Sequence, residues 1–160
     1  MDYIQIKKDN VFTIGIKDKD GNDTGEVIKI DLEDLKLPLK AQESEKMIKD
    51  NNRWLQAQRI MIEKRPDKKG KKLLSANEEA LLKLVNEYYE RQTKAWELVL
   101  GEGSIKKLLC GRDMYITFFY ELEEQMKVIK PKLDKNAVDI NDKIKAIAQK
   151  YSEKDSDVME

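Results

Sequence analysis

The chain has 160 residues and balances 31 basic against 31 acidic residues, so its formal net charge is zero. It contains no histidine and a single cysteine, Cys110, which excludes a Ser-His-Asp or Cys-His catalytic site, an intrachain disulfide and a thiolate zinc site. Hydrophobic residues make up 40% of the chain, yet no stretch approaches the roughly 20 apolar residues of a membrane span. We therefore expect a soluble, cytoplasmic protein that is not an enzyme and binds no cofactor or metal.

The N-terminal part of the sequence predicts a small antiparallel β-sheet. Residues 12–16 alternate in the period of a half-buried strand. Residues 27–30 predict a second strand, and the turn-forming residues of 18–25 lie between the two. Residues 3–6 predict a third strand, with 7–10 as its turn. Because a hairpin alone is barely stable in water, this sheet is expected to pack on helices or on another subunit.

The rest of the sequence predicts a mainly helical body, so the expected fold class is α+β, with an N-terminal antiparallel β-hairpin sheet followed by helices. We expect a β segment over residues 1–37 and a helical body over 38–151, with a basic loop at 64–74 inside it. A flexible polar tail is expected over 152–160, because polar chain ends that contact nothing tend to fray.

The first long helix is predicted from 38 to 65, with Pro38 in its first turn. Its apolar residues form pairs seven residues apart, and the positions between them hold Asn and Gln. Such a narrow stripe is typical of a seam between helices, and Met and Trp suit a partner's groove. The candidate partner-binding residues are Met47, Trp54, Leu55, Met61 and Ile62. The alternative is that this stripe packs against the next helix of its own chain.

A basic segment follows at residues 64–72, where six positive residues accompany one aspartate, and Pro66 and Gly70 end the helix. We interpret it as a solvated loop between two helices. The alternative is a contact with nucleic-acid phosphates, although no aromatic residue is interleaved with the lysines. Ser75 and Glu78 then form a capping-box pattern, which predicts the start of the next helix.

The helix from about 76 to 100 has the widest apolar face, so we expect it to be the most buried element and the centre of the core. Its expected core residues are Leu81, Val85, Tyr88, Trp96 and Val99. Gly101 is expected to end this helix as a C-terminal cap.

Three shorter helices are predicted in the C-terminal part. The first covers about 104–110, and its Cys110 is expected to be a buried, unreactive thiol. The second is expected to be capped by Asp113 and to end at Pro131, because the residue before a proline avoids the helical region. The third covers about 137–151.

One stretch of the sequence carries a resemblance to a known family. The residues from Trp96 to Asp113 read WELVLGEGSIKKLLCGRD, and an aromatic-rich helix that starts near Tyr115 and closes on Pro131 follows them. This order of helix, Gly-rich break, short helix and aromatic helix resembles the tail assembly chaperones of long-tailed bacteriophages and prophages of Gram-positive hosts. The resemblance covers residues 96–131 in wording and about 1–135 in architecture.

The resemblance implies a chaperone in the cytoplasm of a bacterial host cell. It would bind the phage tape-measure protein, prevent its aggregation before the tail tube polymerises, and form a homo-oligomer. Neither a membrane nor a nucleic acid is an expected partner. Two other functions stay open: a structural tail or head-tail connector protein, and a small nucleic-acid-binding regulatory protein that uses the basic loop at 64–72.

Overall fold

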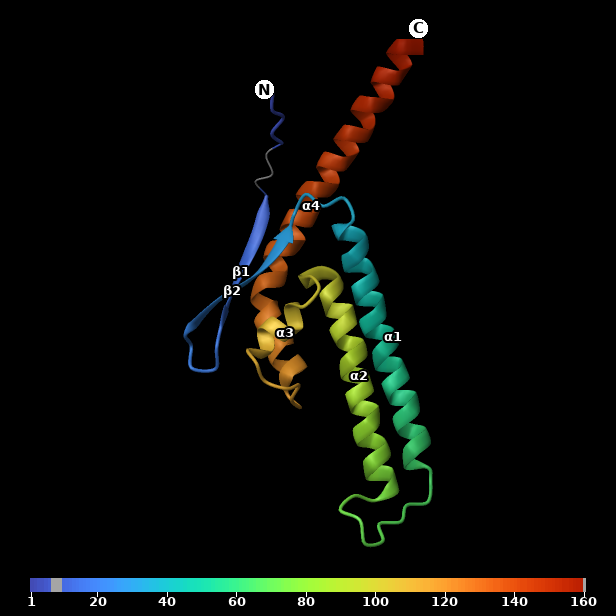
Figure 1. The fold of residues 1–160 in the computed structure, drawn as a ribbon. Coiled ribbons are helices and arrows are strands. Elements are labelled where there is room, and N and C mark those ends of the chain that lie inside the picture. The colour runs from blue at the N-terminus through green and yellow to red at the C-terminus, as the bar shows by residue number, and fades with distance from the viewer. Residues whose placement is uncertain (7–9, 160) are drawn as a thin grey trace.

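The computed structural model describes residues 1–6 and 10–159, with side chains up to Glu153. It confirms the predicted α+β class, because an N-terminal antiparallel hairpin precedes a helical body (Figure 1). The elements in chain order are β1 (Val11–Lys17), β2 (Asp23–Asp31), α1 (Leu37–Glu63), α2 (Ala76–Leu100), α3 (Ser104–Leu109) and α4 (Phe118–Met159).

The hairpin of β1 and β2 has one apolar face, which explains its place against the helices. Phe12 pairs with Ile30 and Ile14 pairs with Ile28 across the ladder, so that the apolar side chains of both strands share a face. The turn between the strands is closed by Asp18, whose Oδ1 accepts hydrogen bonds from two backbone N–H groups at 2.9 Å. Both predicted strands are therefore confirmed.

The predicted third strand is not present in the described N-terminal residues. Residues 1–6 have no regular secondary structure, and the side chains of Tyr3, Ile4 and Ile6 are almost fully exposed. The predicted turn at 7–10 falls mainly on 7–9, which lie outside the described residues. Alternation over only four residues is too weak a signal to determine strand pairing, since pairing also needs an apolar surface on which the strand can pack.

Helices α1 and α2 form a long antiparallel pair (Figure 1). Pro38 lies in the first turn of α1, and Ser75 caps α2 by accepting a hydrogen bond from the Glu78 N–H at 3.1 Å. Gly101, with φ of 99°, ends α2, in a conformation that favours glycine. The sequence signals for these helix ends are thus confirmed.

The seam between α1 and α2 is partly polar. Buried Asn51 donates a hydrogen bond from Nδ2 to Gln92 Oε1 at 2.9 Å. One heptad earlier, the buried Ser44 hydroxyl donates to the Ala95 carbonyl at 2.6 Å. Asn51, between two apolar pairs of α1, and Ser44 therefore face α2, where both have a hydrogen-bond partner.

Helix α4 corrects two predictions. It runs without a break from Phe118 to Met159, through Pro131, whereas the sequence suggested one helix ending at Pro131 and another over 137–151. A proline removes one backbone hydrogen bond and disfavours the helix locally. Here Pro131 lies on the exposed side, where water can solvate the freed carbonyl. The helix also begins at Phe118, so Asp113 lies in the preceding loop and does not cap it.

The apolar core consists of two clusters at the junction of the hairpin with the helices. The first contains Ile16, Ile28, Ile30, Leu32, Leu100 and Ile140. The second contains Ile105, Phe118, Phe119 and Leu122. The centre of the core is therefore the hairpin with the nearby parts of α2, α3 and α4, not the whole face of α2 as predicted.

Two predictions of burial are wrong. Val85 is 37% exposed, because the side of α2 that faces α1 is set by Leu84, Gln92 and Ala95, which are buried. Cys110 is exposed. It ends α3 with φ of 52°, and this sharp change of direction at the helix end turns the residue away from the leucines before it.

Candidate partner-binding groove

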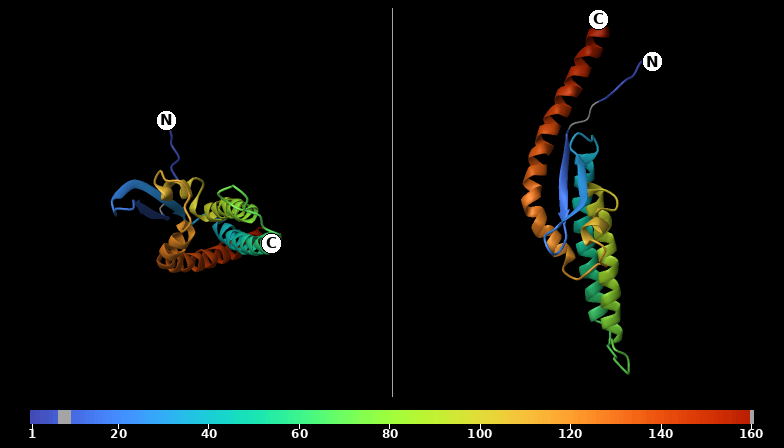
Figure 2. Two further views of the ribbon diagram at one scale, coloured as in Figure 1. Left: turned by 90° about the horizontal axis from the view of Figure 1, so that it is seen from below. Right: turned by 60° about the vertical axis from the view of Figure 1, so that its left-hand side comes forward.

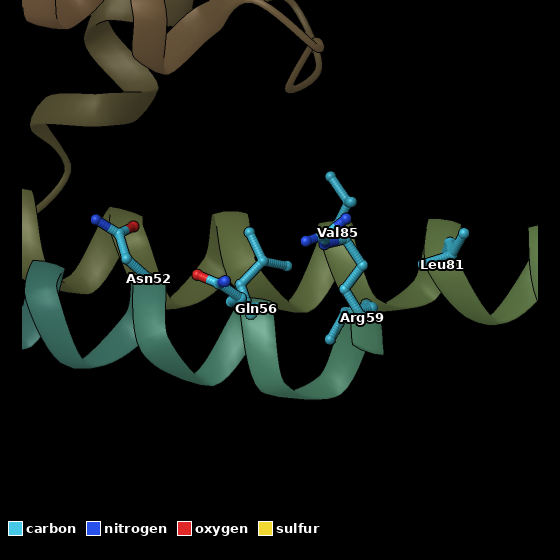
Figure 3. Close-up of a pocket in the computed structure, with 7 residues that line it drawn as sticks. Asn52, Gln56, Arg59, Leu81 and Val85 are labelled. Atoms are coloured by element: carbon cyan, nitrogen blue, oxygen red, sulfur yellow. The ribbon is translucent and has the colours of Figure 1, made fainter. Parts of the chain in front are cut away.

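An open groove runs along one side of the seam between α1 and α2, with a volume of about 410 Å³. Figure 3 shows side chains from α1 and from α2 along the two neighbouring helices. The lining residues are Asn52, Leu55, Gln56, Arg59, Leu81, Leu84 and Val85.

Helical spacing explains why these residues share one side. Asn52, Gln56 and Arg59 are four and three positions apart on α1, and Leu81 and Val85 are four positions apart on α2. Residues at such spacings lie on the same face of a helix. The groove therefore has an apolar α2 side and an α1 side that is polar except for Leu55, a pattern that suits an amphipathic helix lying between them.

The electrostatics of the groove are mild. Arg59 contributes the one charged side chain of the lining and pairs with Glu63 at 3.5 Å. At the other end, the Tyr88 hydroxyl donates a hydrogen bond to Asn52 Oδ1. Burial raises the pKa of Tyr88 above its ordinary value.

The structure does not keep the sequence-predicted binding stripe together on one surface. Leu55 lines the groove, whereas Ile62 is only 6% exposed and is buried within its own chain. Met47 is half-buried, and Met61 is 54% exposed. The stripe therefore includes one groove residue, one core residue and a line of residues on another side of α1.

Trp54 belongs to that other side. Trp54 and Gln56 are two positions apart, which corresponds to about 200° around a helix, so their side chains point in nearly opposite directions. The Trp54 ring is half-buried beneath the Arg91 guanidinium, which lies 3.7 Å from the ring centroid. This cation–π contact comes from α2, so Trp54 packs at least partly against its own chain.

Most of the residues that line the groove were not predicted from the sequence as binding residues. Its polar wall consists of Asn52, Gln56 and Arg59, which belong to no apolar pattern in the sequence. The sequence predicts Leu81 and Val85 in the core. A usable signal was the neighbouring Leu82, which is exposed. The apolar face of α2 is wider than the surface that one partner helix can cover, so part of this face is exposed to solvent.

The basic loop between α1 and α2 is also fully exposed over residues 64–72. Its single carboxylate, Asp67, accepts hydrogen bonds from the Ser75 hydroxyl and from the Asn77 N–H, and these hold the pKa of Asp67 below its ordinary value. Asp67 thus remains ionised and is held against the start of α2. The loop follows the end of α1 that carries Arg59, and its six positive residues are not among those that line the groove.

A second hollow lies among the β-hairpin turn, the end of α3 and the start of α4. Its lining includes Cys110, Tyr115 and Arg112, whose guanidinium lies 4.3 Å from the Tyr115 ring centroid. The Tyr115 hydroxyl donates to Glu121, and this hydrogen bond raises the pKa of Tyr115.

Over residues 1–6 and 10–153, no group of three or more Cys, Asp or Glu residues is arranged to hold a metal ion. No described helix combines the length and the hydropathy that a membrane span requires. Comparisons with protein-family models, with curated proteins and with solved structures each give no match.

Proposed function

We propose that the chain is a non-enzymatic tail assembly chaperone, which binds the helical tape-measure protein of a long-tailed phage and keeps it soluble before the tail tube polymerises. The observation that carries the proposal is the open groove between α1 and α2, with its apolar wall of Leu81, Leu84 and Val85. The resemblance of residues 96–131 to such chaperones supplies the identity of the client.

The groove suits a client that must be released again. An amphipathic helix that lies in it would cover the exposed part of Val85, the neighbouring Leu82 and the half-buried Leu55. Each apolar side chain that becomes fully buried contributes about 1.5–3 kcal/mol, and part of this is offset by the lost freedom of the client. A few such contacts give weak binding at each site, and many copies along one long client can still keep it soluble.

Met61 offers a second contact of the same kind. It is one of the predicted stripe residues, and it is exposed on α1 just before the basic loop. A Met side chain adapts to different apolar partners at low cost, which suits a client whose sequence changes along its length. Met61 belongs to the line of α1 that also contains Trp54.

The test is co-expression with the tape-measure protein of the same phage. Val85→Asp places a charge on the apolar wall of the groove, and Val128→Asp makes the same change at an exposed position of α4 outside it. We expect the tape-measure protein to precipitate with the Val85→Asp chain and to stay soluble with the Val128→Asp chain. Circular dichroism checks that both variants are folded.

Two outcomes separate the candidate surfaces. If Val85→Asp keeps the client soluble and Met61→Ser does not, the client uses the Met61 side of α1. If the unmodified chain does not keep the tape-measure protein soluble, the proposed function is wrong.

A further inference from the structure

The hairpin has two edges, and in the described chain only the β2 edge is covered by another element. On the β2 side, Lys107 of α3 donates a hydrogen bond to the Val27 carbonyl at 3.3 Å. The described sheet consists of β1 and β2, and the start of β1 lies on the side of the hairpin away from α1 and α2 (Figure 1). An open strand edge presents N–H and C=O groups that can pair with a further strand.

The hydrogen bonds of the hairpin determine which backbone groups of β1 point outward. The Leu32 N–H donates to the Asn10 carbonyl at 2.9 Å, so these two opposite residues form a hydrogen-bonded pair. Hydrogen-bonded and non-hydrogen-bonded pairs alternate along an antiparallel ladder. The backbone groups of Val11, Thr13 and Gly15 therefore point away from β2, toward the open edge.

This edge lacks the features that usually protect an edge strand. Charged side chains and proline commonly prevent further pairing, but residues 11–16 contain neither. Beside Gly15 the exposed face is open, since no atom outside the neighbouring residues lies within 4 Å of the position of an added Cβ. A shift of register between Gly15 and Lys17 ends the regular part of the strand, so residues 11–15 are available for pairing.

The apolar side chains next to the open edge are incompletely covered. On β2, Ile28 and Ile30 are 4% and 2% exposed, whereas their partners Ile14 and Phe12 on β1 are only partly buried. Coverage of the apolar face thus decreases from β2 toward the open edge. An apolar strand added beside β1 would continue the hairpin cluster and bury more of both side chains.

The sequence of β1 is complementary to itself in one antiparallel register. When two copies pair about Thr13, the outward backbone groups of residues 11, 13 and 15 form hydrogen-bonded pairs across the contact. Phe12 of each copy then lies opposite Ile14 of the other, in a non-hydrogen-bonded pair where cross-strand side chains are closest. On the exposed face Thr13 lies opposite its own copy, and residues 11–15 oppose no like charges.

This pairing leaves room for the helices that cover the apolar face. Helix α4 lies against that face (Figure 2) and contacts the hairpin cluster through Ile140. Two strand spacings set the midlines of the two hairpins about 9.6 Å apart, close to the distance of about 8–10 Å between packed helices. A two-fold axis perpendicular to the sheet makes α4 and its copy antiparallel, so they run side by side and do not cross.

We propose that two copies of the chain pair through β1, antiparallel about Thr13, and form one four-stranded sheet in the order β2–β1–β1–β2. The contact is symmetric and closed, so it gives a dimer and does not propagate from copy to copy. It lies outside the α1–α2 groove, so the inference does not rest on the proposed function.

The first test is sedimentation equilibrium of the full chain over a range of concentrations. The unmodified chain is expected to form a dimer. Thr13→Lys and Thr13→Glu should each give a monomer, because each places two like charges opposite one another at the centre of the contact. Mixed together, these two variants should form a one-to-one complex, since the charges are then opposite. Circular dichroism checks that both variants are folded.

A disulfide tests the register directly. In a Cys110→Ser background, Thr13→Cys should form an oxidised dimer, because opposite residues of a hydrogen-bonded pair lie about 5.5 Å apart between Cα atoms, which suits a disulfide. Lys29→Cys in the same background is the matched control. Lys29 lies opposite Thr13 on β2, so its two copies would be three strand spacings apart and should not cross-link.

Several results would overturn the proposal. A chain that is monomeric at every concentration would do so, including the case in which residues 3–6 pair with the β1 edge of their own copy. A dimer that survives Thr13→Lys, or one that is lost with Val85→Asp in the groove, would place the contact elsewhere. Loss of client solubility with an intact dimer would instead contradict only the chaperone proposal.

Discussion

Two buried hydrogen bonds make the seam between α1 and α2 selective. Asn51 and Gln92 bond side chain to side chain, and Ser44 bonds to the backbone one heptad earlier. A buried amide without a partner is costly, whereas two apolar side chains in the same place are not. These polar pairs therefore favour one register of the two helices, since any slide along the seam would leave the amides unpaired.

A double-mutant cycle tests this role. Asn51→Ala should lower the free energy of unfolding by about 1–3 kcal/mol, because Gln92 is left buried and unpaired. Asn51→Leu combined with Gln92→Leu should recover most of that loss. Urea unfolding measures both, and Asn86→Ala, at an exposed position of α2, serves as the control with little effect. If the double Leu variant loses as much free energy of unfolding as Asn51→Ala, the hydrogen bond between the two amides stabilises the fold by more than the avoidance of an unpaired buried group.

The structural role of a single residue could be predicted from the sequence where it depends on adjacent residues. The capping of α2 by Ser75 depends on a few adjacent residues, so its pattern predicts its structure. The exposure of Val85 and Cys110 was not predictable, because it depends on where α1 and α4 lie. The same reason explains the groove: Leu55 and Leu81 are far apart in the sequence, and their shared wall exists only after α1 and α2 pair.

At the scale of whole elements, α4 shows tertiary packing overriding a local signal. The helix has contacts with the core on both sides of Pro131, with Met126 before it and Leu133 and Ile140 after it. Packing at both ends can compensate for the missing backbone hydrogen bond of the proline. The sequence predicted both halves as helices with the correct apolar faces, but their continuity was decided by distant contacts.

Replacing this proline measures its local cost. Proline inside a helix is about 3 kcal/mol less favourable than alanine, so Pro131→Ala should raise the free energy of unfolding by about 1–3 kcal/mol. Thermal or urea unfolding followed by circular dichroism gives the value, with Lys132→Ala, at the next exposed position, as control. A decrease in stability would mean that the geometry imposed by the proline is needed for both halves to contact the core.

In the whole molecule, Trp96 connects the two apolar clusters. Its ring packs against the hairpin cluster and against the aromatic cluster at the start of α4. Among the described residues, its Nε1 is buried without a hydrogen-bond partner. The fold class and the helical body were predictable, because composition and periodicity report them. The contact of Trp96 with both clusters was not predictable, since it depends on segments that are distant in the sequence.

Removal of this ring should therefore weaken the whole fold. Trp96→Ala is expected to lower the free energy of unfolding by about 3–5 kcal/mol, and Trp96→Phe by less, because the phenyl ring keeps most of the packing without the unpaired N–H. Tyr3→Ala, at an exposed side chain of the N-terminal segment, should leave unfolding unchanged. An unchanged melting temperature for Trp96→Ala would refute this role of the ring.

The position of the hairpin in the chain has a consequence for synthesis on the ribosome. Both strands are complete at residue 31, but the buried face of Ile16, Ile28 and Ile30 is covered by Leu100 and Ile140. Until those residues emerge, the nascent hairpin exposes its apolar face, which can associate with neighbouring nascent chains. The helical pair, by contrast, can form from local contacts as soon as it is made. Translation rate over the second half of the message would therefore influence how much of this protein reaches its folded state.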